Sequence, residues 1–171
     1  VDQSQPSDDT DGSEPGSDSE SNGDDGADGD SSAVEILDYE FTLASGPADE
    51  QLERDDDGLG AAPSIIDQTR DDTSAEVTIA GIVTGNNGCM EGQLLSAPAV
   101  DGETITAGVG TAVREEVAKR REEGEQVACT HVIVQDRYEL TIEYSGALDH
   151  FAITQSGMEL TGEPYQLRPS W

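Results

Sequence analysis

The stretch "RYELTIEY", residues 137–144, decides the fold class. Its apolar side chains, Tyr138, Leu140, Ile142 and Tyr144, alternate with polar or charged ones. A period of two places all four on one face of a β-strand, which predicts a strand with that face in an apolar core. It is the clearest strand signal in the chain.

Weaker versions of the same pattern occur along most of the chain after residue 33, and Asn-Gly and Asp-Gly pairs mark turns between them. The further predicted strands are "VEILDYEFTL" (34–43, with Leu37, Tyr39, Phe41 and Leu43 inward), "EVTIAGIVTG" (76–85, with Val77, Ile79, Gly81 and Val83 on one face), "CMEGQLLSAPAV" (89–100), "DGETITAGVG" (101–110, with Ile105, Ala107 and Val109 on one face) and "HFAITQ" (150–155). Six or seven short strands with one helical interruption predict an all-β, antiparallel sandwich. Residues 44–72 are expected to be a polar loop with a small apolar patch at Ile65 and Ile66.

The charge is strongly acidic, with 38 Asp and Glu against eight Lys and Arg and a formal net charge of −30. Such a surface repels nucleic acid and anionic lipid, so neither is expected as a direct partner. Self-repulsion strains a compact state at ordinary salt, whereas at about 1 M salt the screening length falls to about 3 Å. The charge therefore predicts a halophilic host. The alternative is an acidic mesophilic protein with a long acidic tail.

The acidic residues are not confined to a tail, which favours the halophile. Residues 1–32 contain 11 acids and no base, and residues 33–171 contain 27 acids and eight bases, a net charge of −19.

Residues 1–32 form a separate segment by composition. Val1 and Ala27 are their only apolar residues, so the segment cannot bury enough surface to offset its ordering entropy and is predicted to be disordered. Like charges should keep it extended, as in a stalk. The predicted organisation is thus an acidic Ser/Asp/Gly linker or stalk at 1–32 and a β-sandwich domain at 33–171.

The sequence shows no signal peptide and no run of 18 apolar residues. It begins with Val1 rather than methionine, which suggests a processed product from which a leader or lipid anchor has been lost. No Asn-X-Ser/Thr site occurs in the chain, so ordinary N-glycosylation is excluded.

One calcium-like pattern, "DDGADGDSSAVE", lies at residues 24–35. It matches the EF-hand loop at positions 1, 5, 6, 7 and 12, which are Asp24, Asp28, Gly29, Asp30 and Glu35. Position 3 is Gly26, which offers no side-chain ligand, and no helix enters the loop. A chance match in an Asp/Gly-rich tract is the preferred interpretation, and no metal site is predicted.

The stretch "VREEVAKRREEGEQVACTH", residues 113–131, holds the only lysine and three of the seven arginines. It predicts a helix over residues 112–123, with Thr111 as N-cap and Gly124 as the C-terminal stop. A solvated crossover helix explains the pattern, because its cations gather toward the C-terminal half. The alternative is a docking site for an acidic partner, formed by Arg114, Lys119, Arg120 and Arg121.

The two cysteines, Cys89 and Cys129, are an even count in a chain whose other features suggest export, so a disulfide is predicted. Two alternatives remain open. Zinc would need both cysteines with His131 and His150, whose spacings match no common finger. A thiol nucleophile would pair Cys129 with His131, but nothing in the sequence orients such a base.

Searches for catalytic motifs find no glycine-rich phosphate loop, no HExxH and no GxSxG. Carboxylate pairs are so abundant that none is informative. We therefore expect no enzyme and no cofactor. The alternative is a secreted enzyme or enzyme inhibitor acting through loops near His131 and His150, which predicts a pocket enclosing both imidazoles.

The run from "VTIAGIVTGNNGCMEGQLL" through "CTHVIVQDRYELTIEYSGALDHFAITQSG" resembles a family of uncharacterised haloarchaeal secreted proteins and lipoproteins. The family pattern is a "VxGxIxGxxGC" strand and turn, a hairpin, a second cysteine and a "YxxxxxxxGxLP" strand. The matching positions are Gly81, Gly85, Gly88, Cys89, Leu94, Cys129, Tyr138, Gly146 and Leu148. The chain departs from the pattern at Asp149, where proline is usual, and in its basic inserted helix.

This resemblance implies an immunoglobulin-like β-sandwich that is exported, often lipid-anchored and has its cysteines bridged, and it implies no activity. Together with the composition it predicts a non-catalytic extracellular or cell-surface binding or structural module, displayed on an acidic stalk. Its expected partner is another envelope or surface protein.

Overall fold

The computed structural model describes residues 33–44, 60–156 and 162–171. The predicted disorder of residues 1–32 therefore lies outside the described residues, and so do all the calcium-like positions except Glu35.

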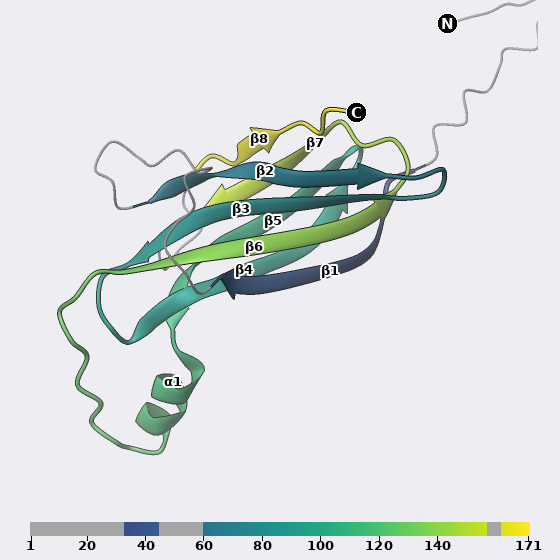
Figure 1. The fold of residues 1–171 in the computed structure, drawn as a ribbon. Coiled ribbons are helices and arrows are strands. Elements are labelled where there is room, and N and C mark those ends of the chain that lie inside the picture. The colour runs from purple at the N-terminus through teal and green to yellow at the C-terminus, as the bar shows by residue number, and fades with distance from the viewer. Residues whose placement is uncertain (1–32, 45–59, 157–161) are drawn as a thin grey trace, which may run out of the picture.

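Eight strands and one helix make up the described chain. They form two four-stranded sheets, in the orders β1-β6-β3-β2 and β4-β5-β7-β8, which lie face to face (Figure 1). The strands are β1 (Glu35–Ala44), β2 (Ala61–Arg70), β3 (Ala75–Gly85), β4 (Met90–Asp101), β5 (Thr104–Val113), β6 (Val134–Ser145), β7 (His150–Gln155) and β8 (Tyr165–Leu167), and the helix is α1 (Glu115–Glu122).

The prediction of a mostly β fold with one short helix is confirmed, but the sheets are not purely antiparallel. β5 and β7 pair in parallel, from Thr104 opposite His150 to Val109 opposite Gln155. The chain leaves β5 through α1, returns along β6 in the other sheet, and enters β7 in the direction of β5. Because the antiparallel return along β6 lies in the opposite sheet, β5 and β7 run in the same direction as neighbours in their own sheet.

Two strands lie where none was predicted. β2 occupies part of the expected polar loop, and β8 is a three-residue strand beside β7. β2 has no simple alternation because its pairing with β3 shifts register twice, between Ala61 and Ser64 and between Ile65 and Asp67. A bulged edge strand therefore escapes a search for period two.

The stretch that predicted the fold lies in β6, which pairs with β1 on one side and β3 on the other. Its four apolar side chains are buried as predicted. They pack into one core with inward residues of both sheets, chiefly Val77, Ile79, Ile105, Val109, Phe151 and Ile153.

β1 fulfils its predicted pattern only in part. Phe41 packs against the core, but Leu37, Tyr39 and Leu43 are 48%, 44% and 38% exposed. The register with β6 shifts between Ile36 and Asp38, so that Ile36, and not Leu37, packs against the core. The position of β1 at a sheet edge leaves the inward-facing side of Tyr39 and Leu43 partly uncovered.

A buried polar link joins the two sheets. The Tyr138 hydroxyl donates to Gln155 Oε1 at 2.7 Å, and Gln155 Nε2 donates to the carbonyls of Ala61 and Ile82 at 2.8 and 3.1 Å. A Cβ at Gly81 would lie 2.5 Å from Gln155 Oε1, so the glycine leaves the space that this link occupies. Burial raises the pKa of the Tyr138 phenol, which therefore stays a neutral donor.

Candidate functional site

Residues 114–133 stand off one end of the sandwich between β5 and β6, and we call them the appendage (Figure 1). They comprise α1 and the segment that leads from it to β6. The appendage contains all four predicted docking cations, His131 and Cys129.

The start of α1 differs from the prediction. β5 continues to Val113, so Thr111 is a buried strand residue and not the N-cap. The N-cap is Arg114, which makes no side-chain capping hydrogen bond. The predicted helix 112–123 is thus shortened to Glu115–Glu122, because strand pairing with β4 holds the preceding residues.

The predicted stop at Gly124 is confirmed. Gly124 has a φ of +85°, a conformation that glycine adopts without strain. Its N–H donates to the Arg121 carbonyl and the Glu125 N–H donates to the Arg120 carbonyl, at 3.0 and 2.9 Å. These two bonds form a Schellman motif, which satisfies the last carbonyls of the helix.

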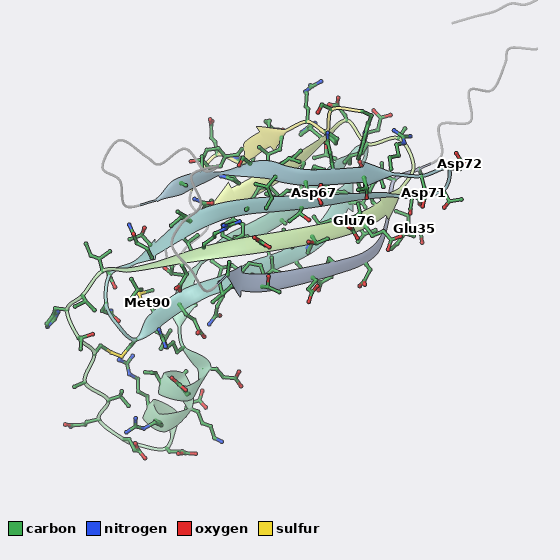
Figure 2. The ribbon with its side chains drawn as sticks, in the orientation of Figure 1. Glu35, Asp67, Asp71, Asp72, Glu76 and Met90 are labelled. Atoms are coloured by element: carbon green, nitrogen blue, oxygen red, sulfur yellow. A yellow bond between two sulfur atoms is a disulfide. The ribbon has the colours of Figure 1, made fainter. Side chains whose placement is uncertain are left out.

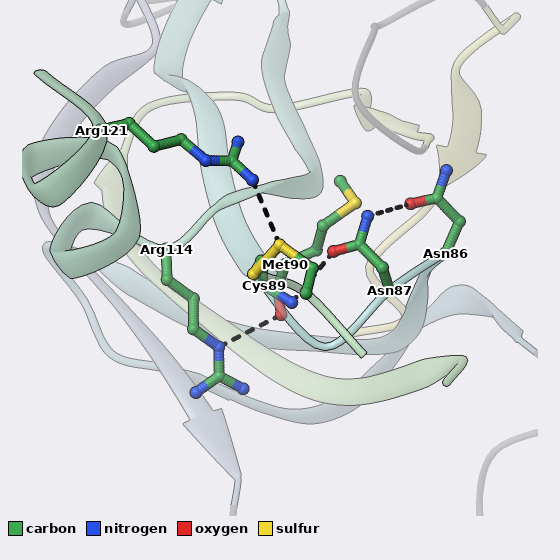
Figure 3. The surroundings of a disulfide bond; sticks show 7 residues. Asn86, Asn87, Cys89, Met90, Arg114 and Arg121 are labelled. Carbon is green, nitrogen blue, oxygen red and sulfur yellow. Dashed lines mark hydrogen bonds between the residues drawn. A yellow bond between two sulfur atoms is a disulfide. The ribbon is translucent and has the colours of Figure 1, made fainter. Parts of the chain in front are cut away.

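The predicted disulfide between Cys89 and Cys129 is confirmed, with the two Cα atoms 5.3 Å apart (Figure 3). Both cysteines of the chain are in this bond, so neither is a zinc ligand or a free nucleophile. Backbone bonds reinforce the junction, since Gly88 N–H donates to the Thr130 carbonyl and Arg114 N–H to the Cys89 carbonyl, both at 2.9 Å. The appendage is therefore fixed covalently to the start of β4.

Three of the four predicted docking cations make contacts within the appendage or at its junction with the sandwich. Arg114 Nε donates to the Met90 carbonyl at 3.4 Å, and Arg121 Nη2 lies 3.2 Å from Cys129 Sγ (Figure 3). Arg120 Nε pairs with Glu125 Oε2 at 2.6 Å, and both side chains are about half exposed. Such exposed pairs contribute only about 0–1 kcal/mol, so Arg120 can exchange this partner for another at little cost.

The surface around these cations is mixed in charge rather than basic. An open depression of about 450 Å³ is lined by Arg114 and Lys119 but also by three carboxylates, Glu91, Glu115 and Glu116. Glu91 comes from β4 and could not be assigned to the helix surface from its sequence position. The appendage also exposes two large apolar side chains, Val132 at 54% and Ile133 at 56%.

The two histidines lie at opposite ends of the sandwich. His131 is an exposed residue of the appendage, beside the disulfide, whereas His150 begins β7 and pairs with Thr104 at the far end of β5. Ten residues of β5 separate the two ends, which is about 33 Å at 3.3 Å per residue. A single pocket therefore cannot enclose both imidazoles. The alternative function, a secreted enzyme or enzyme inhibitor acting through loops near both histidines, lacks the shared pocket that it predicts.

His150 takes part in a local polar contact. Its Nδ1 lies 2.8 Å from Asp149 Oδ2 and its Nε2 lies 3.4 Å from Thr104 Oγ1. The hydrogen bond from His150 is the main cause that lowers the pKa of Asp149, and Arg168 Nη1 lies 3.2 Å from the other carboxylate oxygen. The order Thr–His–Asp is that of a hydroxyl nucleophile, its base and the group that orients the base. The 3.4 Å between Thr104 Oγ1 and His150 Nε2 is longer than a well-formed hydroxyl hydrogen bond, so the hydroxyl is not activated in this arrangement.

The outer face of the β1-β6-β3-β2 sheet gathers carboxylates. The register places Asp38 opposite Glu143 and Glu143 opposite Glu76, so three acids cross three neighbouring strands. Figure 2 shows further acidic side chains along this sheet and its β2–β3 turn, including Asp67, Asp71 and Asp72. Like charges directly opposite one another destabilise a sheet, and the effect shrinks as salt screens them.

Two negative findings hold for the described ranges. None of their helices is long and apolar enough to cross a membrane. Within the same ranges, no group of three or more His, Cys, Asp or Glu side chains is arranged to hold a metal ion.

Comparison with protein-family models, with curated proteins and with solved structures found no match to the chain. The haloarchaeal resemblance therefore stays a prediction.

Proposed function

We propose that this protein is a non-catalytic extracellular or cell-surface module of a halophile, which binds or supports another envelope protein and is displayed on the acidic stalk of residues 1–32. The disulfide between Cys89 and Cys129 carries the proposal. Disulfides form and persist in oxidising compartments and are rare where cytosolic reductants act. The module would need no cofactor.

Two further observations support the halophilic, surface-exposed part of the proposal. Directly opposed carboxylates on the outer sheet face are tolerated best at molar salt. The haloarchaeal resemblance points to the same kind of host and to export. The immunoglobulin-like class also belongs to this proposal, and two sheets that share one core support it.

A free-thiol count with intact mass, on denatured protein taken from its native host, tests export. We expect no free thiol and a mass two hydrogens below that of the reduced chain, because the bridge forms on export. Any additional mass would identify a lipid anchor or a sugar on the stalk. Two free thiols in the native protein would place it in a reducing compartment and refute the surface module.

The appendage is the proposed contact site for an envelope partner, with Lys119, Arg120 and Arg121 facing acidic groups. Its support is the covalent junction, which holds the helix in place before a partner arrives. Little ordering entropy is then lost on binding.

Charge reversal tests this contact. Arg120→Glu with Arg121→Glu should reduce co-sedimentation of the protein with envelope membranes of the host by about tenfold. The two substitutions turn attraction between the appendage and acidic groups of the partner into repulsion. Arg168→Glu, at an exposed cation outside the appendage, is the matched control and should leave co-sedimentation unchanged. Equal binding by all three proteins would remove the appendage from the contact.

A further inference from the structure

The sandwich has four edge strands, β1, β2, β4 and β8. An edge strand presents unpaired backbone groups to other chains, and proteins commonly block it with proline, bulges or very short length. Three of the four edges carry these devices. β2 contains Pro63 and two register shifts, β4 contains Pro98 and two register shifts, and β8 has three residues.

β1 has fewer of these devices, and its regular part is protected by the acidic charge of Asp38 and Glu40. Its single register shift lies near its start, between Ile36 and Asp38. From Asp38 to Ala44, seven consecutive residues pair regularly with β6 and include no proline, glycine or lysine. Among the described residues β6 is the sheet neighbour of β1, and the opposite edge of β1 is the border of the sheet (Figure 1).

The side chains of β1 also project beyond the core. Tyr39 and Leu43 share the face of Phe41, which packs on the core, yet both are among the exposed large apolar residues. Leu43 reaches across to β4, where a Cβ at Gly92 would lie 3.0 Å from its Cδ2. A strand added beside β1 would cover the exposed parts of Tyr39 and Leu43. It would also pair with the backbone groups on the side of β1 where the described residues place no strand.

We propose that Asp38–Ala44 is a docking edge for an extended segment of another protein, in which β-branched residues alternate with Lys or Arg. Pairing along a sheet edge supplies backbone hydrogen bonds, and alternate side chains supply specificity. On the outer face the added strand would lie beside Asp38 and Glu40, with Glu143 on β6 behind them. Glu139, also on β6, already pairs with Arg137 at 2.7 Å. Opposite charges across strands are favourable and like charges are not, so the outward residues of the partner are cationic.

Two other occupants are disfavoured by the same charges. A second copy of β1 would bring its own Asp38 and Glu40 to this face. Residues 45–59, which follow β1 in the chain, contain six acids and one base. Each of them would add negative charge to a face that already has an excess.

This inference deepens the proposed binding role by naming a partner class, and it rests on that role. It does not depend on the compartment or the appendage, which the thiol count and the charge reversal of Arg120 and Arg121 test separately. Failure at β1 would leave those results standing.

A synthetic nine-residue peptide that alternates Thr or Val with Lys is the probe, and the same peptide with Glu in place of Lys is its control. Both are titrated into the full ¹⁵N-labelled chain at the lowest KCl concentration that keeps it folded, because salt screens the charges that distinguish the two peptides. We expect the amide signals of Asp38–Ala44 to shift saturably and to exchange more slowly with solvent. The Lys peptide should bind about tenfold more tightly than the Glu peptide.

Tyr39→Lys places a charge where the added strand would bury it, and should weaken binding of the Lys peptide by about tenfold or more. Val100→Lys makes the same kind of change at an exposed apolar residue of β4 and should have no effect. Tyr39→Thr keeps a strand-forming residue, so it supplies the test if the lysine variant does not fold, with a smaller loss.

Three results would overturn the proposal. The first is the absence of shifts in β1 with either peptide, and the second is equal affinity for the Lys and Glu peptides. The third is self-association in sedimentation velocity that Tyr39→Lys abolishes, which would assign the edge to a second copy.

Discussion

Transfer of the protein from about 1 M to about 0.1 M KCl is expected to lower its midpoint of thermal unfolding by about 10 °C or more. The screening length grows from about 3 Å to about 10 Å over this range, so carboxylates on neighbouring strands repel one another more strongly. Asp38, Glu143 and Glu76 lie directly opposite one another across β1, β6 and β3. Circular dichroism over a series of KCl concentrations measures the effect.

Glu143→Gln identifies the source of the salt dependence. It removes the central charge of the row, while an amide oxygen can still accept the hydrogen bond that Ser74 Oγ donates to Glu143. The variant should be stabilised at low salt by about 0.5–2 kcal/mol and little changed at molar salt. Glu40→Gln, opposite the uncharged Thr141, is the matched control and should gain less. A wild-type protein equally stable at both salt concentrations would contradict a halophilic design.

Removal of the disulfide is expected to cost about 4 kcal/mol of the free energy of unfolding. Cys89 and Cys129 are 40 residues apart, and a bridge over such a loop restricts the unfolded chain by about that amount in the chain-entropy model. The loop contains β4, β5 and α1, so the bridge constrains both strands of one hairpin and the whole helix. Denaturant unfolding of the Cys89→Ser/Cys129→Ser double variant, at molar salt, measures the loss.

Arg121→Ala is the control for the disulfide variant, since it removes the contact at Cys129 Sγ and keeps the covalent bond. It should cost no more than about 1 kcal/mol, as expected for an exposed interaction. A double cysteine variant that is no less stable than Arg121→Ala would show that backbone bonds at Gly88 and Arg114 hold the junction without the bridge.

Several features follow from local sequence alone. Alternation in residues 137–144 identified the central strand and its buried face, because side-chain direction repeats every two residues in any strand. The helix stop at Gly124 was predictable since a left-handed residue after a helix favours glycine. The pairing of Cys89 with Cys129 needed only an even count and an expectation of export.

The start of the helix and the face of β1 were decided by tertiary pairing. Thr111 has a good capping side chain, yet its pairing with Gly92 in β4 keeps it in a strand, so α1 begins later. Leu37 fits the inward alternation of β1, but a register shift against β6 brings Ile36 to the core instead. In both places pairing with the neighbouring strand overrides the local preference of the sequence, because that strand offers more hydrogen bonds and more buried area.

The candidate surfaces depend still more on long-range pairing. The sequence by itself determined that the protein is acidic, that it is mostly β and that its two cysteines form a disulfide, because composition and period can be read without the fold. Only the tertiary structure set Glu76 opposite Glu143, ran β5 parallel to β7, separated His131 from His150 and left β1 at a border. The physical reason is that alternation specifies which face of a strand is buried, whereas its neighbours are chosen by the packing of the whole chain.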